Sequence, residues 1–287
     1  MSKAIENGYS EKQIAHFESE VMKLRNAQPR VQMDLGLLVE QMSVQRAKVY
    51  GSQAMGRRLP VIEQTVLNIF DIYPPDRKDF LSKSDCTNIA IQLHAFAINV
   101  YAIFDNAAWV CMLEDGEDLS PIKVGLYKKE CRKYIPEGLV AYMNQPIIKK
   151  WFEDYGKVYR DSTAHRIPPY LPSRNYTSTE AAQWKKIHNE STSLLFEFVS
   201  DETHEQINER LEKHHQLESK KNGIGSNSLF VALTLEGEDA EHPVFLHPQL
   251  LSDWALVHEF VTTFTISLRE KYNWESPNLP EMMVSEI

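Results

Sequence analysis

Apolar residues recur at spacings of three and four along most of the chain, which is the pattern of amphipathic helices. The first such stretch begins at Ser10, a residue suited to cap a helix, and continues with Ile14, Phe17, Val21 and Leu24. The same pattern predicts helices over residues 10–27, 31–53, 59–72, 85–114, 146–166, 177–221 and 247–272. We therefore expect a mainly α-helical protein.

Polar and proline residues punctuate these helices. Ser84 or Asp85 can cap the long apolar helix, and Asp115-Gly116 ends it. Thr177 and Glu180 have capping-box spacing and predict the start of another helix. Between the last two helices, residues 229–235 and 243–246 flank the polar turn 236–239, which indicates a small β-hairpin.

These boundaries suggest four segments. We expect an N-terminal helical extension over 1–80, core helices over 81–175, a charged helix with the hairpin as an insertion over 176–247, and a closing helix with a tail over 248–287.

Composition is that of a globular protein, with 43% apolar and 25% charged residues among 287. Three widely spaced cysteines and no basic-then-apolar leader at residues 1–10 lead us to expect a cytoplasmic location. The apolar stretch 89–113 is interrupted by polar residues too often for a membrane span. The sequence shows no recognisable zinc spacing, P-loop or dinucleotide fingerprint, so we expect no metal and no cofactor.

Charge is unevenly distributed. The whole chain carries a formal net charge of −9, which argues against indiscriminate binding to nucleic acid. Residues 121–174, however, contain eleven Lys/Arg against five Asp/Glu, a local balance of +6. This segment is either a chance clustering on solvated helix faces or a surface that attracts anions.

The basic segment contains the most informative stretch, Arg160-Asp161-Ser162-Thr163-Ala164-His165, which lies just before Pro168. Arginine can fork onto phosphate oxygens, and histidine can move a proton near neutral pH. Pro168 disfavours helical geometry at Ile167, so we expect His165 in the last helical turn or just past it. The stretch therefore suits phosphate chemistry.

Helix geometry limits how these residues can cooperate. Five residues apart, Arg160 and His165 point about 140° away from each other. Asp161 and His165 are neighbours at i,i+4 and can touch, so the stretch can equally be an ion pair of Asp161, His165 and Arg166 at a helix end. The spacing alone is weak evidence, because Arg210 and His215 repeat it in a highly charged helix where a solvated face is expected.

The hexapeptide 160–165 resembles the R-x4-6-H motif of the HEPN superfamily, where a polar residue such as Asp161 usually follows the arginine. Its continuation through residues 166–170 is similar to a bacterial branch of that superfamily with an AHRIP-type extension. The apolar helix 85–114 resembles the long core helix that precedes the motif there. The resemblance covers about 85–175 and, less closely, 248–272, and it implies a HEPN-like helical bundle.

Many HEPN proteins are metal-independent endoribonucleases that act as dimers. The resemblance implies that His165 is a general acid/base, that Arg160 binds the phosphate, and that Asp161 orients His165. Lys157 and Arg166 are then expected to contact the substrate. RNA and a second copy of the chain are the implied partners, with no membrane.

Toxin and phage-defence roles are common in the superfamily, so an antitoxin or another regulatory partner is a further expectation. A dimer would solve the 140° problem if arginine and histidine from both chains met around one phosphodiester. Aromatic residues Trp151, Phe152 and Tyr155, or the helix 85–114, would have to hold two such basic segments together.

Some HEPN domains are non-catalytic, so the alternative is a helical interaction protein whose motif only ends a helix and supports dimerisation. The position of His165 distinguishes these hypotheses. An exposed His165 in a basic cleft near Arg160 favours catalysis, whereas a buried ring whose two nitrogens bond backbone carbonyls favours the structural role.

Overall fold

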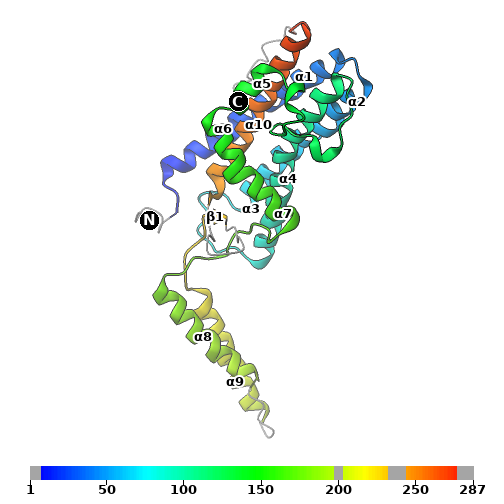
Figure 1. Cartoon of the computed structure of the whole chain (residues 1–287). Coiled ribbons are helices and arrows are strands. Elements are labelled where there is room, and N and C mark those ends of the chain that lie inside the picture. The colour runs from blue at the N-terminus through cyan, green and yellow to red at the C-terminus, as the bar shows by residue number, and fades with distance from the viewer. Residues whose placement is uncertain (1–7, 197–202, 232–243, 277–287) are drawn as a thin grey trace.

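A computed structural model describes residues 8–196, 203–231 and 244–276, and the described chain is mainly α-helical, as predicted (Figure 1). Its α-helices are α1 (Glu11–Gln41), α2 (Gln45–Val49), α3 (Arg58–Ile72), α4 (Lys83–Glu114), α5 (Glu137–Met143), α6 (Pro146–Lys150), α7 (Lys157–His165), α8 (Ser178–Phe196), α9 (His204–Asn222) and α10 (Leu246–Tyr272). Two π-helical turns, η2 (Tyr50–Met55) and η5 (Trp151–Gly156), and two 3₁₀ turns, η3 (Pro121–Lys123) and η4 (Arg132–Tyr134), complete the helical part.

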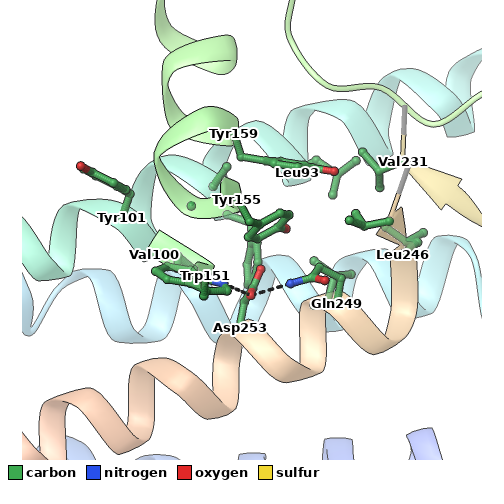
Figure 2. Close-up of a pocket in the computed structure, with 15 residues that line it drawn as sticks. Leu93, Val100, Tyr101, Trp151, Tyr155, Tyr159, Val231, Leu246, Gln249 and Asp253 are labelled. Atoms are coloured by element: carbon green, nitrogen blue, oxygen red, sulfur yellow. Dashed lines mark hydrogen bonds between the residues drawn. The ribbon is translucent and has the colours of Figure 1, made fainter. Parts of the chain in front are cut away.

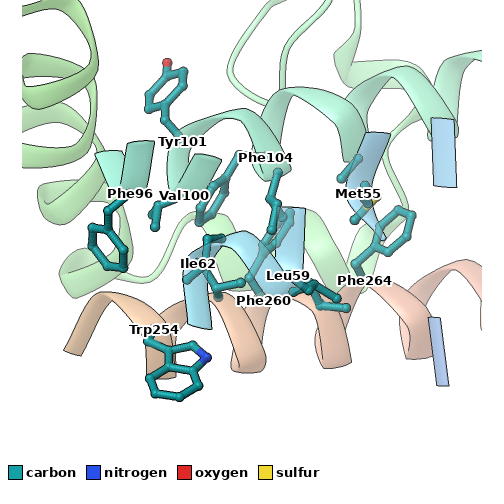
Figure 3. Close-up of a cluster of buried hydrophobic side chains, with 14 of the residues drawn as sticks. Met55, Leu59, Ile62, Phe96, Val100, Tyr101, Phe104, Trp254, Phe260 and Phe264 are labelled. Atoms are coloured by element: carbon teal, nitrogen blue, oxygen red, sulfur yellow. The ribbon is translucent and has the colours of Figure 1, made fainter. Parts of the chain in front are cut away.

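The core forms where α4 lies between α3, α7 and α10. Figure 3 shows side chains of α4 and α10 meeting there, with Leu59 and Ile62 contributed by α3. Phe104 stacks on Phe260 with ring centroids 4.2 Å apart, and Trp254 is fully buried. Residues of the expected N-terminal extension share this core, because the buried cluster runs without interruption from α1 to α10.

The N-terminal region differs from the prediction. We expected separate helices over 10–27 and 31–53, but α1 continues through Pro29 to Gln41. Proline in a helix interior costs about 3 kcal/mol. Packing outweighs this cost, since Leu24, Gln28 and Val31 on either side of the proline are buried against α10.

The break comes instead after α1, where a buried carboxylate takes the place of helical hydrogen bonds. Glu114, at the end of α4, accepts the backbone N–H groups of Ser43 at 2.6 Å and Val44 at 3.1 Å. Val44 is the N-cap of α2, so its N–H is one of the donors that a starting helix leaves free, and Ser43 directly precedes it. The chain therefore turns here and α2 begins.

The α4 helix is confirmed with one correction to its cap. Ser82, rather than Ser84 or Asp85, is the N-cap, and Asp85 completes the capping box from the third helical position. Among the described residues, α4 alone is long and apolar enough to cross a membrane, but 67% of its 18-residue apolar window is buried inside the protein. It is thus the central helix of the core.

The expected helix over 177–221 is two helices. The capping box of Thr177 and Glu180 starts the first, as predicted. A second capping box, of Thr203 and Gln206, starts α9, so one continuous helix was the wrong prediction. Together α8 and α9 form an arm that extends away from the rest of the molecule (Figure 1).

A short antiparallel pair of strands, β1 (Phe230–Val231) and β2 (Val244–Phe245), matches the expected hairpin in its described part. Phe230 faces Phe245 across the pair. The predicted turn at 236–239 lies outside the described residues.

A buried carboxylate joins the segment before α7 to α10. Oδ1 of Asp253, on α10, accepts Nε1–H of Trp151 at 2.7 Å and Nε2–H of Gln249 at 2.8 Å (Figure 2). Only 1% of Asp253 is exposed. The Trp151 ring lies so close to Gly156 that a Cβ there would be 2.8 Å from it, so the glycine lets the indole reach Asp253.

We expect Asp253→Asn to change how stability depends on pH. Burial raises the pKa of Asp253 to about 7, whereas an unfolded aspartate titrates near 4. Between these values the folded state holds a proton that the unfolded state has released, so stability falls as the pH rises. Asparagine keeps an oxygen for Trp151 and Gln249 and carries no charge. The variant should therefore exceed the wild type by roughly 2–4 kcal/mol at pH 8, and match it or fall below it at pH 4.

Urea unfolding of both proteins at pH 4, 6 and 8 measures this difference. Burial lowers the pKa of His247 and of His258 to about 4, so these two residues make the fold more stable as the pH rises. Both proteins contain them, so their contribution cancels in the difference between the two free energies of unfolding. Asp154→Asn, an exposed change on η5, is the control. A stability difference that is independent of pH would show that Asp253 does not titrate in the folded protein.

Candidate functional site

The motif lies on the last turns of a helical run from Pro146 to His165, close to the predicted range of 146–166. The run contains the π-helical turn η5, which fits about one extra residue into the helix. Helical geometry ends at Arg166, whose φ and ψ are −135° and −147°. His165 is the last residue of α7, as Pro168 led us to expect.

Arg160 packs on the outer side of α4. Its guanidinium carbon lies 4.4 Å from the centroid of the Tyr101 ring, and its Nη1 lies 3.0 Å from Oδ1 of Asp161. Burial lowers the pKa of Arg160, but interactions with Tyr101, Asp161 and Asp105 raise it by more, and the net shift is upward. Nε of Arg160 is buried without a hydrogen-bond partner in the described structure. The group is thus a firmly charged, positioned cation.

Asp161 does not hold His165 in this structure. Its carboxylate pairs with the guanidinium of the adjacent Arg160 instead, and no hydrogen bond joins it to the imidazole in the part of the chain that is described. The expected ion pair of Asp161, His165 and Arg166 at the helix end is likewise not formed there.

The ring of His165 is exposed. Within residues 8–196, 203–231 and 244–276, neither of its nitrogens bonds a backbone carbonyl or a side chain. Arg166 is exposed beside it, and its backbone N–H donates to the carbonyl of Ser162 at 3.2 Å. A structural histidine that closes a helix end would be bonded to the backbone, so the exposed ring of His165 differs from the one expected for that role, although it lies outside the groove beside Arg160.

A groove of about 500 Å³ opens beside Arg160. It lies between α4, α7 and the segment 121–128, and its cations are Arg160, Lys157 and Lys128. Both lysines are exposed, and neither forms an ion pair with another described residue. The structure thus brings Lys157 to Arg160, whereas His165 and Arg166 do not line this groove.

The groove contains residues that the sequence did not single out as functional. The carboxylate of Asp105 faces it, together with the aromatic residues Tyr101, Tyr127 and Phe152. Burial raises the pKa of Asp105 even though the charges of Arg160, Lys128 and Arg58 lower it. The available signal was Asp105 itself, the only Asp, Glu, Lys or Arg in the stretch 89–113.

No hydrogen bond from any described residue reaches the Asp105 carboxylate. Gly125 keeps the space above it open, since its φ of +156° suits glycine and a Cβ there would lie 3.7 Å from Oδ1 of Asp105 and 3.2 Å from Cγ of Lys128. A carboxylate that is partly buried, close to three cations and without a hydrogen-bond donor is unusual, because such groups are normally satisfied.

Comparisons of the chain with protein-family models, with curated proteins and with solved structures found no match. Among the described residues, no group of three or more His, Cys, Asp or Glu side chains could hold a metal ion. An interpretation of the site therefore depends on its own residues: an exposed histidine, a positioned arginine and a cationic groove with aromatic walls.

Proposed function

We propose that this protein is a HEPN-type endoribonuclease that cleaves RNA phosphodiesters without a metal ion, with Arg160 and His165 as its catalytic residues. The observation that carries the proposal is the exposed, unbonded imidazole of His165 at the end of the helix that also presents Arg160 to a cationic groove. A ring that no protein group occupies is free to exchange protons with a substrate.

In this mechanism the imidazole of His165 takes the proton of a ribose 2′-OH. The 2′-oxygen then forms a bond to phosphorus while the bond from phosphorus to the 5′-oxygen breaks. The products are a 2′,3′-cyclic phosphate and a 5′-hydroxyl, and the leaving oxygen receives a proton from a second acid or from water. Arg160 stabilises the charge that develops on the phosphate oxygens.

The active site is composite in this proposal. Because α7 stays helical through His165, Arg160 and His165 remain about 140° apart on one helix. One copy of the chain then cannot aim both groups at one phosphate, whereas two antiparallel copies can each supply what the other lacks.

Apolar residues near the motif are available to hold two copies together. Ile91 and Ile98 lie seven residues apart on α4 and are 56% and 39% exposed. Ile167 and Tyr170 are exposed after α7, and the carbonyl of Pro169 lies 3.0 Å from Nε2 of His94 on α4, so the two groups are close. Trp151, Phe152 and Tyr155, which we expected as dimer contacts, instead pack in the core and its cavity.

The biological setting belongs to the same proposal. A cytoplasmic toxin or phage-defence ribonuclease must be restrained, so an antitoxin or another regulatory partner is expected. The arm of α8 and α9, which protrudes from the other helices, is a surface that such a partner could bind (Figure 1).

A non-catalytic interaction protein is the second candidate, and the same arm favours it. Leu195, Phe196 and Leu211 on the arm are 48%, 78% and 42% exposed. Exposed apolar groups of this size are typical of surfaces that bind other proteins. This candidate would be established if the protein cleaved no RNA but bound a protein partner through the arm.

We expect purified protein to cleave total RNA in the presence of EDTA, and His165→Ala to lower the rate by about 10²–10⁴-fold, the usual contribution of a general acid/base. Gel analysis and detection of 2′,3′-cyclic phosphate ends measure both. His215→Ala, an exposed histidine on α9, is the matched control and should cleave normally. Activity that EDTA abolishes and Mg²⁺ restores contradicts the mechanism, and equal cleavage by His165→Ala makes His165 structural.

Arg160→Lys should lose most of the activity, by about tenfold or more, because an ammonium group cannot reproduce the planar fork of a guanidinium on a phosphate. The same cleavage assay measures it, with the exposed Arg57→Lys as the control. Near-full activity of Arg160→Lys would mean that Arg160 supplies charge alone.

Sedimentation should show a homodimer, and RNA or sulfate should strengthen it by relieving repulsion between two segments of charge +6. Mixing Arg160→Ala and His165→Ala chains, each inactive, should restore about a quarter of the wild-type activity. Half of the dimers would be mixed, and each mixed dimer would carry one intact composite site. A protein that is active as a strict monomer rules out the composite site.

A further inference from the structure

We propose that the groove beside Arg160 is a nucleotide site that selects guanine, with Asp105 reading the base and Lys128, Lys157 and Arg160 holding the phosphate. This inference deepens the proposed ribonuclease function by naming the base next to the cleaved phosphodiester. It rests on the proposed ribonuclease function only in taking RNA as the source of the nucleotide. Binding of a nucleotide in the groove can be tested without any cleavage.

The size and the walls of the groove suit a nucleotide. Its volume of about 500 Å³ lies within the range of small-molecule sites. The half-buried Tyr127 lines it beside Ile122, which is 78% exposed at the rim, while the buried ring of Tyr101 carries the guanidinium of Arg160 on its face. Single-stranded nucleic acids are recognised by stacking of their bases on such surfaces.

The groove carries several positive charges. Lys128 and Lys157 are exposed and make no ion pair with another described residue, so both can neutralise a phosphate. Arg160 lies on Tyr101 with its guanidinium partly exposed to the groove. These groups are suited to a phosphate, but they do not explain an acidic residue in the same groove.

The Asp105 carboxylate lacks a hydrogen-bond donor among the described residues and would repel a phosphate. An ionised carboxylate only accepts hydrogen bonds, and its two oxygens match two adjacent N–H groups. The Watson–Crick edge of guanine presents such a pair, N1–H and the N2 amino group. Adenine and cytosine place an unprotonated ring nitrogen beside their amino group. Uracil flanks its N3–H with two carbonyl oxygens. In each of these bases an acceptor lone pair would therefore face one oxygen of the carboxylate.

Gly125 supports this assignment. A side chain at this position would stand 3.7 Å from Oδ1 of Asp105, so glycine leaves the carboxylate open to a flat ligand. The groove therefore combines a carboxylate without a hydrogen-bond donor, cations for a phosphate, and the partly exposed Tyr127 with Ile122 as a surface for the base, which together suit a guanine nucleotide.

The test begins with the unaltered protein. Isothermal titration of the full-length chain with GMP, IMP, AMP, CMP and UMP compares the bases, and IMP differs from GMP only by the missing N2 amino group. We expect GMP to bind at least about tenfold more tightly than each of the others, since a lost bidentate contact to a base costs this much or more. Equal binding of GMP and IMP, a preference for another base, or no binding overturns the inference.

Variants then assign the roles. Asp105→Asn, which is nearly isosteric, should remove the preference for GMP, whereas the exposed Asp154→Asn should not. Lys157→Gln and Lys128→Gln should weaken all nucleotides alike, and Lys129→Gln, an exposed neighbour that does not line the groove, should change nothing. An Asp105→Asn protein that melts like the wild type and still prefers GMP overturns the role of Asp105.

A second arm identifies the source of the nucleotide. Single-stranded 2′-O-methyl oligonucleotides, which cannot be cleaved by 2′-OH attack, are compared with guanine or uracil at one position. A preference for the guanine oligonucleotide supports RNA as the source, while binding of GMP alone supports a free guanine nucleotide in the same groove.

His165→Ala separates the two proposals. It should keep the preference for GMP over IMP, because His165 does not line the groove in which Asp105 contacts the base. If GMP binds through Asp105 but no RNA is cut, the ribonuclease proposal fails and the groove stands. If RNA is cut without any preference for guanine, the guanine site in the groove fails and the ribonuclease proposal stands.

Discussion

The contact of Asp253 with Trp151 is the interaction on which the position of the candidate site depends. Burying a carboxylate is costly unless it is hydrogen-bonded, and here two N–H groups from different parts of the chain meet one oxygen. This contact ties η5 to α10 and leads directly into α7. Gly156 and the π-helical turn are what allow the indole to reach Asp253 across the start of α7. The orientation of the motif helix thus follows from one polar contact inside an apolar core.

That orientation gives the two sides of the helix different tasks. Tyr155 and Tyr159 line a pocket beside Asp253, whereas the ring of Tyr101, which borders the same pocket, points away from Asp253 (Figure 2). On the side of Tyr101, Lys157 and Arg160 face the groove. The aromatic residues before the arginine therefore serve the core, and the charged residues among them serve the surface. This division explains why the motif helix has both the apolar pattern of a buried helix and exposed cations.

Sequence reasoning succeeded where local rules decide the structure. The spacing of apolar residues predicted α4 and α10, the capping box at Thr177 predicted the start of α8, and Pro168 predicted the end of α7 at His165. It failed where contacts between distant residues decide, as in the passage of α1 through Pro29. The groove belongs to this second class, because Asp105 and Lys128 meet Arg160 only through the packing of separate segments. A motif along one helix could name Arg160 and His165, but not their surroundings.

The charges of the site argue for an anionic ligand that also donates hydrogen bonds. Lys128, Lys157 and Arg160 gather in one groove of a protein whose net charge is −9, so attraction of anions is local and not a property of the whole surface. A simple phosphate would satisfy these cations and leave Asp105 opposed to it. An RNA strand differs in this respect, since each phosphate is joined to a base with its own N–H groups. In the proposed function the groove binds one part of the strand through its cations and another through its carboxylate, and His165 acts on a phosphodiester presented by a second copy of the chain.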